Sequence, residues 1–107
     1  MRILLDECVP RPIRRELIGH EVHTVTGMGW AGKKNGELLA LIASASFDVF
    51  ISVDQNLPYQ QNLRAAGIAV LVMIAPSNRL RDLLPLMETV RQSLDNVQRG
   101  QSIAIGG

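Results

Sequence analysis

Residues 1–10 read MRILLDECVP and residues 49–58 read VFISVDQNLP, and these two stretches decide the fold. In each of them a short apolar run ends on an aspartate, Asp6 in the first and Asp54 in the second. Continuous apolar runs of this length are typical of strands buried on both faces of a parallel sheet. Because ligands bind outside the carboxyl ends of such strands, we expect an acidic site at that edge.

The remainder of the chain alternates between strand-like and helix-like patterns. This alternation predicts an α/β fold, a three-layer α/β/α sandwich with a mostly parallel central sheet of four to five strands, in a single domain of residues 1–107. For residues 100–107 the sequence is consistent with either an edge strand or a frayed tail. Strands are expected at residues 2–5, 21–26, 49–53 and 68–74, and helices at residues 10–18, 35–46, 60–66 and 80–97, the last interrupted at Pro85.

Composition narrows the class of protein. The chain has 107 residues, 47% of them apolar and 20% charged, which suits one globular domain. The net charge of +1 neither requires nor excludes a nucleic-acid partner. The one cysteine, Cys8, fits a reducing compartment, and no apolar run approaches the roughly 20 residues that span a bilayer. We therefore expect a cytoplasmic protein without a membrane segment.

A third carboxylate is expected beside the two aspartates. Glu37 falls in the first turn of the helix that follows the second strand, and such a helix begins near the carboxyl edge. Three gathered carboxylates repel one another unless a cation neutralises them, and oxygen ligands suit Mg²⁺ or Mn²⁺. Each residue also has a structural explanation that needs no metal. Asp6 and Asp54 can be turn or capping residues, and Glu37 can be a favourable charge at the start of a helix.

Basic and aromatic side chains follow the same strands. They are candidates for holding a nucleic-acid backbone or stacking on an unpaired base. The alternative for the basic residues is a charged face exposed to solvent. The alternative for the tryptophan is a position in the core or in a dimer interface. These candidates are Arg11, Arg14, Arg15, Trp30, Lys33 and Lys34.

Four segments together resemble a known family. The residues at 4–10 (LLDECVP), 19–22 (GHEV), 35–39 (NGELL) and 52–57 (SVDQNL), in this order and spacing, resemble the small PIN-like proteins of unknown function. Those proteins look like compact relatives of VapC-type toxin ribonucleases. The resemblance extends over nearly the whole chain.

The resemblance implies a PIN-like sandwich with an acidic Mg²⁺ or Mn²⁺ site. Asp6, Glu37 and Asp54 correspond to the family's catalytic and metal-binding acids, and Asn56 stands where PIN nucleases usually have a further acid. The implied activity is metal-dependent endoribonuclease, in the toxin component of a toxin–antitoxin pair whose antitoxin is a small DNA-binding protein. The amide at Asn56 leaves open a catalytically inert module that binds RNA or protein. A homodimer is also open, since a small sheet leaves edges and apolar helix faces to cover.

A signalling domain is the alternative from another class. Receiver-like phosphoacceptor domains also place acids after the first strand and an aspartate after the third. They need a lysine after the fifth strand, however, and this chain has no lysine beyond Lys34. The nuclease is therefore the preferred hypothesis.

Overall fold

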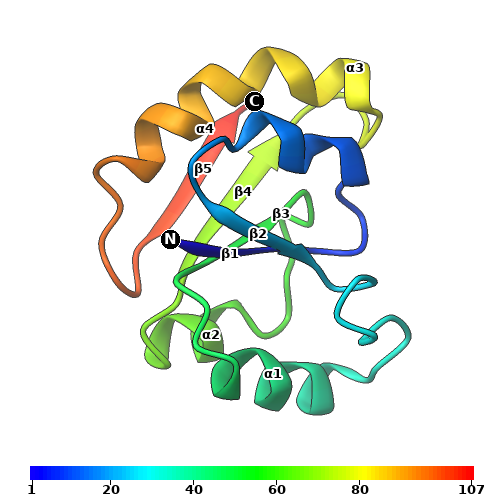
Figure 1. The fold of residues 1–107 in the computed structure, drawn as a ribbon, viewed down its shortest axis with the longest axis vertical. Coiled ribbons are helices and arrows are strands. Elements are labelled where there is room, and N and C mark those ends of the chain that lie inside the picture. Colours follow the sequence, from blue (N-terminus) through cyan, green and yellow to red (C-terminus); the bar gives the residue numbers. More distant parts are fainter.

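Five parallel strands form one sheet in the order β2-β1-β3-β4-β5 (Figure 1). The computed structural model describes all of residues 1–107. The α/β class and the parallel sheet predicted from the sequence are confirmed. The strands are β1 (Arg2–Leu5), β2 (Glu21–Thr24), β3 (Val49–Ser52), β4 (Ala69–Ile74) and β5 (Ser102–Gly106).

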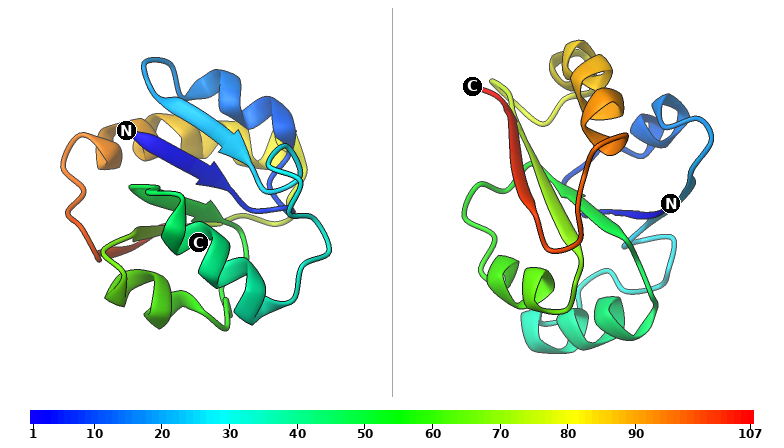
Figure 2. Two further views of the ribbon diagram at one scale, coloured as in Figure 1. Left: turned by 60° about the horizontal axis from the view of Figure 1, so that its bottom comes forward. Right: turned by 90° about the vertical axis from the view of Figure 1, so that its left-hand side faces the viewer.

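Helices cover both faces of the sheet and complete three layers (Figures 1 and 2). One face carries α1 (Asn35–Ser44) and α2 (Gln60–Ala65). The other face carries the 3₁₀ helix η1 (Arg11–Glu16) and the chain of α3 (Leu80–Leu83), η2 (Leu84–Leu86) and α4 (Met87–Leu94). No helix is long and apolar enough to cross a lipid bilayer.

Alternation along the strands divides the core in two. Leu5 and Ile51 belong to a cluster that packs under η1 and α4, whereas Leu4 and Phe50 belong to a cluster under α1 and α2. All four side chains are completely buried. Successive strand residues point to opposite faces, so the side chains of β1 and β3 enter both cores, and Ile3 to Leu5 and Val49 to Ile51 are all apolar. This explains why their sequence patterns are continuous runs.

Two expected elements differ in detail from the structure. The helix expected at residues 10–18 is a shorter 3₁₀ helix, in which Ile13 N–H donates to Pro10 O (3.0 Å) and Leu17 N–H to Arg14 O (3.2 Å). β2 ends at Thr24 and not at residue 26, because the Thr24 hydroxyl accepts a hydrogen bond from Gly27 N–H (2.8 Å) and closes a turn.

The C-terminal third matches the remaining expectations. Pro85 lies in η2, which separates α3 from α4 as its position predicts. The tail, for which a strand and a frayed end were both open, forms β5. In this strand Ser102 to Gly106 pair in register with Val70 to Ile74 of β4.

The strand order creates a switch point between β1 and β3. From β1 the chain continues to β2 on one side, then crosses to β3 on the other side of β1. Open α/β sheets bind ligands outside the carboxyl ends of the strands at such a point, and this order is the flavodoxin-like one. The residues that follow Leu5 and Ser52 therefore occupy the place where a site is expected.

Candidate functional site

Asp6 and Ser52 lie side by side at the switch point. Asp6 N–H donates to Ile51 O (2.9 Å), which extends the pairing of β1 with β3 one residue beyond Leu5. The Ser52 hydroxyl donates to Asp6 Oδ2 at 2.8 Å. Ser52 is fully buried and is the chain's one buried polar residue, whereas Asp6 is half-buried. The hydroxyl therefore holds a carboxylate that still reaches the surface.

The same hydroxyl fixes the start of the next loop. Ser52 Oγ accepts a hydrogen bond from Asp54 N–H at 2.9 Å, so one buried oxygen binds both aspartate positions. Asp54 Oδ1 in turn accepts from Asn56 N–H at 2.9 Å, which is an Asx turn. Asp54 therefore has the turn role considered as its ordinary alternative. Its carboxylate and the Asn56 side chain remain exposed.

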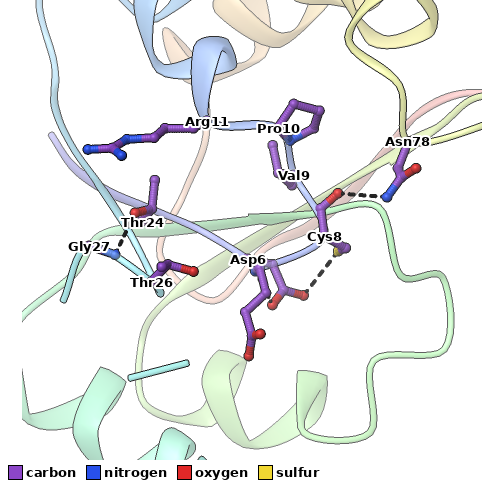
Figure 3. Close-up of a pocket in the computed structure, with 10 residues that line it drawn as sticks. Asp6, Cys8, Val9, Pro10, Arg11, Thr24, Thr26, Gly27 and Asn78 are labelled. Atoms are coloured by element: carbon purple, nitrogen blue, oxygen red, sulfur yellow. Dashed lines mark hydrogen bonds between the residues drawn. The ribbon is translucent and has the colours of Figure 1, made fainter. Parts of the chain in front are cut away.

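A pocket of about 470 Å³ opens beside these residues. In Figure 3, Asp6 lies at one side of this pocket and Arg11 at another, with Thr24 between them. Asn78 closes the rim by donating from Nδ2 to Cys8 O (3.2 Å), which ties the loop after β4 to the loop after β1. The lining consists of Asp6, Glu7, Cys8, Val9, Pro10, Arg11, Thr24, Thr26, Gly27 and Asn78.

Cys8 contacts the Asp6 carboxylate and is not a reactive nucleophile. Its Sγ lies 3.6 Å from Asp6 Oδ2, to which the thiol donates, and 3.7 Å from Ser52 Oγ. Burial raises the pKa of the Cys8 thiol, and the negative charge of Asp6 raises it further. A thiol kept protonated is a poor nucleophile.

Tyr59 is a site residue that the sequence did not suggest. Its ring is 7% exposed and packs edge-on against Phe50, with centroids 6.1 Å apart. Burial raises the pKa of the Tyr59 phenol, and the charges of the acidic groups at this edge, Asp6 first, raise it further. The phenol therefore keeps its proton to a more alkaline pH than an exposed tyrosine does.

Glu37 forms an ion pair with Lys33. Its Oε1 lies 2.9 Å from Lys33 Nζ, one turn earlier, and its side chain is 57% exposed. Glu7 accepts from Gly32 N–H at 3.4 Å. Nowhere in the chain do three or more His, Cys, Asp or Glu side chains gather closely enough to hold a metal ion. The three-carboxylate cluster expected from the sequence stays a prediction.

Two aspartates are nevertheless a sufficient protein donor set for one class of ion. Mg²⁺ keeps several water ligands and is commonly bound through one or two carboxylates plus phosphate oxygens. A carboxylate has about four lone-pair positions, and the hydrogen bonds to Asp6 and Asp54 leave some of these free. In donor type, the carboxylates at this edge are the oxygen ligands that Mg²⁺ or Mn²⁺ prefers, and the metal site stays a prediction.

The basic and aromatic candidates fall into two groups. Arg11 lines the acidic pocket, and together with Arg14 and Arg15 it lines a second pocket on η1. Lys33 pairs with Glu37 and Lys34 is exposed. Trp30 is half-buried and packs edge-on against Phe47, with centroids 6.3 Å apart, which is the core position considered as its alternative.

Comparison with protein-family models, with curated proteins and with solved structures found no match to this chain. The case for a function therefore depends on the geometry of the site.

The sequence pattern predicts the two aspartates at this edge but not the residues around them, Ser52, Tyr59 and Asn78. Ser52 interrupts an otherwise apolar run, and this single polar residue inside a buried strand was the available signal. Tyr59 carried no such signal, because an aromatic residue shortly after Asn56 and Leu57 fits a core position equally well. Asn78 is 70 residues from Cys8 in the sequence, so only the fold brings them together.

Proposed function

We propose that this chain is a metal-dependent endoribonuclease with its site on Asp6 and Asp54, and that its sandwich is of the PIN-like type. The observation that supports this most is the buried Ser52 hydroxyl, bonded to the Asp6 carboxylate at 2.8 Å and to Asp54 N–H at 2.9 Å. A polar group costs free energy to bury unless it is hydrogen-bonded, and here one bond orients the Asp6 carboxylate while the other fixes the backbone at Asp54.

Mg²⁺ or Mn²⁺ would supply Lewis-acid chemistry at this edge, polarising a phosphodiester and lowering the pKa of a water ligand. Asp6 and Asp54 would hold the ion. Glu37 would contribute only after leaving Lys33, and Asn56 would assist with a neutral amide oxygen. The role in a toxin–antitoxin pair is proposed from the sequence resemblance alone.

The protein's own groups orient the substrate and keep the acids in place. Ser52 fixes the rotamer of Asp6, and the Asn78–Cys8 bond holds the rim of the pocket. Tyr59 packs against Phe50 of β3 and so supports the strand that carries Ser52. The exposed carboxylate of Asp54 is the more accessible of the two to solvent and ligand.

The test is cleavage of mixed single-stranded and structured RNA by the purified protein with Mn²⁺, alongside a sample with excess chelator. Asp6→Asn and Asp54→Asn remove one charge each with little change in shape and should abolish cleavage. Asp95→Asn is the matched control, because Asp95 is exposed at the C-terminal end of α4 and is far along the chain from the site. Circular dichroism checks that every variant is folded.

Unchanged cleavage in both site variants would contradict the proposal. No cleavage by the wild type, with Mn²⁺ still raising its melting temperature, would favour the inert PIN-like module that binds RNA or protein. If the protein shows neither cleavage nor a response to Mn²⁺, Asp54 has only the turn role that its hydrogen bond from Asn56 N–H gives it.

A phosphoacceptor domain is the second candidate, and the strand order favours it. The order β2-β1-β3-β4-β5 is that of the flavodoxin-like sheets, and Asp54 follows the third strand. Incubation with Mg²⁺ and acetyl phosphate, followed by mass spectrometry, would detect a phosphorylated Asp54. The absence of any lysine after Lys34 makes this candidate the weaker one.

A further inference from the structure

We propose that the nucleic-acid strand enters the acidic pocket across η1, with its phosphates bound by Arg11, Arg14 and Arg15. The inference rests on the proposed function and deepens it, because it assigns the substrate's path and its mode of binding. The bound class is a single-stranded polyanion recognised through its backbone.

Two neighbouring pockets share one arginine. Arg11 lines the pocket of about 470 Å³ that contains Asp6, and it also lines a pocket of about 350 Å³ formed by Arg11, Pro12, Arg14 and Arg15. The shared side chain places the two pockets next to each other. In the proposed path, phosphates bound in the second pocket lie beside the pocket that contains Asp6.

The 3₁₀ conformation of η1 places two of the arginines in line. Three residues complete a turn in such a helix, so side chains at i and i+3 eclipse and are about 6 Å apart along the axis. Arg11 and Arg14 have this spacing, while Ile13 is buried beneath them and fixes the orientation of the helix. Two arginines about 6 Å apart along the helix axis can each bind a different phosphate of one strand.

These arginines have no acidic partner in the chain. The ion pairs of the structure are Arg2 with Glu21, His23 with Glu21, Lys33 with Glu37 and Arg91 with Glu16. Arg11, Arg14 and Arg15 are all exposed and take part in none of them. Their donors remain available for an external anion, whereas Lys33 on the opposite loop is already occupied.

The character of the patch favours nucleic acid over an acidic protein. Protein–protein interfaces are usually built on a buried core of aromatic or aliphatic residues. The pocket on η1 has only arginines and Pro12 in its lining. Guanidinium groups bind phosphates through two parallel hydrogen bonds, so arginine alone can form such a surface.

The experiment measures binding without cleavage. A fluorescently labelled single-stranded RNA is titrated with protein in excess chelator over a series of salt concentrations. In Arg14→Ala/Arg15→Ala the slope of log affinity against log salt should fall by about 0.7 for each phosphate that the protein no longer neutralises. Arg64→Ala/Arg99→Ala removes the same charge near the amino ends of β4 and β5, and its slope should match the wild type.

The outcomes separate this inference from the proposed function. An unchanged slope in the Arg14/Arg15 variant, or an equal reduction in Lys33→Ala/Lys34→Ala, would overturn the path across η1 even if cleavage stands. Binding of poly-glutamate with the same arginine dependence would assign the patch to an acidic protein and also overturn it. Arginine-dependent RNA binding without cleavage would support the binding of the strand across η1 and would contradict the proposed nuclease activity.

Discussion

Ser52 connects the packing of the sheet with the chemistry of the site. It occupies a position in β3 where every neighbouring strand residue is apolar and buried, yet its hydroxyl has a partner on each side. The hydrogen bonds of Ser52 can stabilise the fold, position the two aspartates, or do both. Substitution can distinguish these roles.

Ser52→Ala should destabilise the protein by about 1–3 kcal/mol, since it leaves Asp54 N–H without its acceptor and removes the hydroxyl donor from Asp6 Oδ2. Urea unfolding measures this cost. If Ser52 also positions Asp6, the Mn²⁺ concentration for half-maximal cleavage rises as well. Ser44→Ala, at an exposed hydroxyl on α1, is the control. An equal and small effect of the two substitutions would contradict the assigned role.

Tyr59 makes the stability depend on alkaline pH. Its folded-state pKa is raised above the ordinary value of 10.0 by burial and by the adjacent acids, Asp6 first. Below that ordinary value both states keep the proton and Tyr59 adds no pH dependence. Above it the unfolded chain loses the proton while the folded chain retains it, so the free energy of unfolding falls as pH rises.

Tyr59→Phe should remove this part of the alkaline decline in stability while keeping the packing against Phe50. Because the chain has one tyrosine, the ultraviolet absorbance of tyrosinate reports Tyr59 alone. Native protein should form tyrosinate at a higher pH than urea-unfolded protein. Coincident titration curves in the two states would show that the phenol is not in the environment described.

At the scale of elements, β5 is the part that sequence reasoning left open. It pairs with β4 and contributes Ile105, which is 3% exposed, to the core under α4. The strand is therefore an integral part of the sheet and not a loose tail.

Ile105→Ala should lower the free energy of unfolding by about 2–5 kcal/mol, the usual cost of truncating a buried isoleucine. Ile18 offers a matched control, because it is the same residue type and is 87% exposed. Ile18→Ala should change stability by less than about 0.5 kcal/mol. Similar urea midpoints for the two variants would mean that β5 does not pack as described.

The sequence predicted most elements because their patterns are strong. Buried strands such as β3 and β4 have continuous apolar runs, and Pro85 interrupts the last helix as expected. The elements that differ from the prediction depend on local effects that the apolar pattern does not show. The first expected helix is the 3₁₀ helix η1, with Pro12 in its first turn, and a side-chain hydrogen bond of Thr24 ended β2 early. Such effects depend on single contacts that periodicity does not reveal.

Prediction of the site was limited for a similar reason. The sheet-edge rule predicts that Asp6 and Asp54 lie at one edge, and Ser52 is bonded both to the Asp6 carboxylate and to Asp54 N–H, while their role as a site stays a prediction. It placed Glu37 by the same logic, but side-chain rotamers and the nearby Lys33 determine where that carboxylate lies. Ser52 and Tyr59 were missed because a buried hydroxyl and a packed phenol show their role only through their neighbours.

At the scale of the whole molecule, strand order determines which loops meet. The sequence predicted a parallel sheet but not that β1 would lie between β2 and β3. This order brings the loops after β1 and β3 together, with Asn78 from the loop after β4 closing the rim. The loop after β2 adds Thr26 and Gly27 to the pocket, so the site is made from four loops on a rigid sheet and should be coupled to the stability of the entire domain.

Metal binding should therefore stabilise the whole fold. An ion that binds only the folded state raises the free energy of unfolding, by about 2.7 kcal/mol when its concentration is 100 times the dissociation constant. We expect Mn²⁺ to raise the melting temperature of the wild type and of Asp95→Asn, but not of Asp6→Asn or Asp54→Asn. Without metal, Asp54→Asn should melt no lower than the wild type if its Asx turn is kept, since Asn also accepts from Asn56 N–H. An equal Mn²⁺ response in all four proteins would place the ion elsewhere and remove the chemical basis of the proposed nuclease.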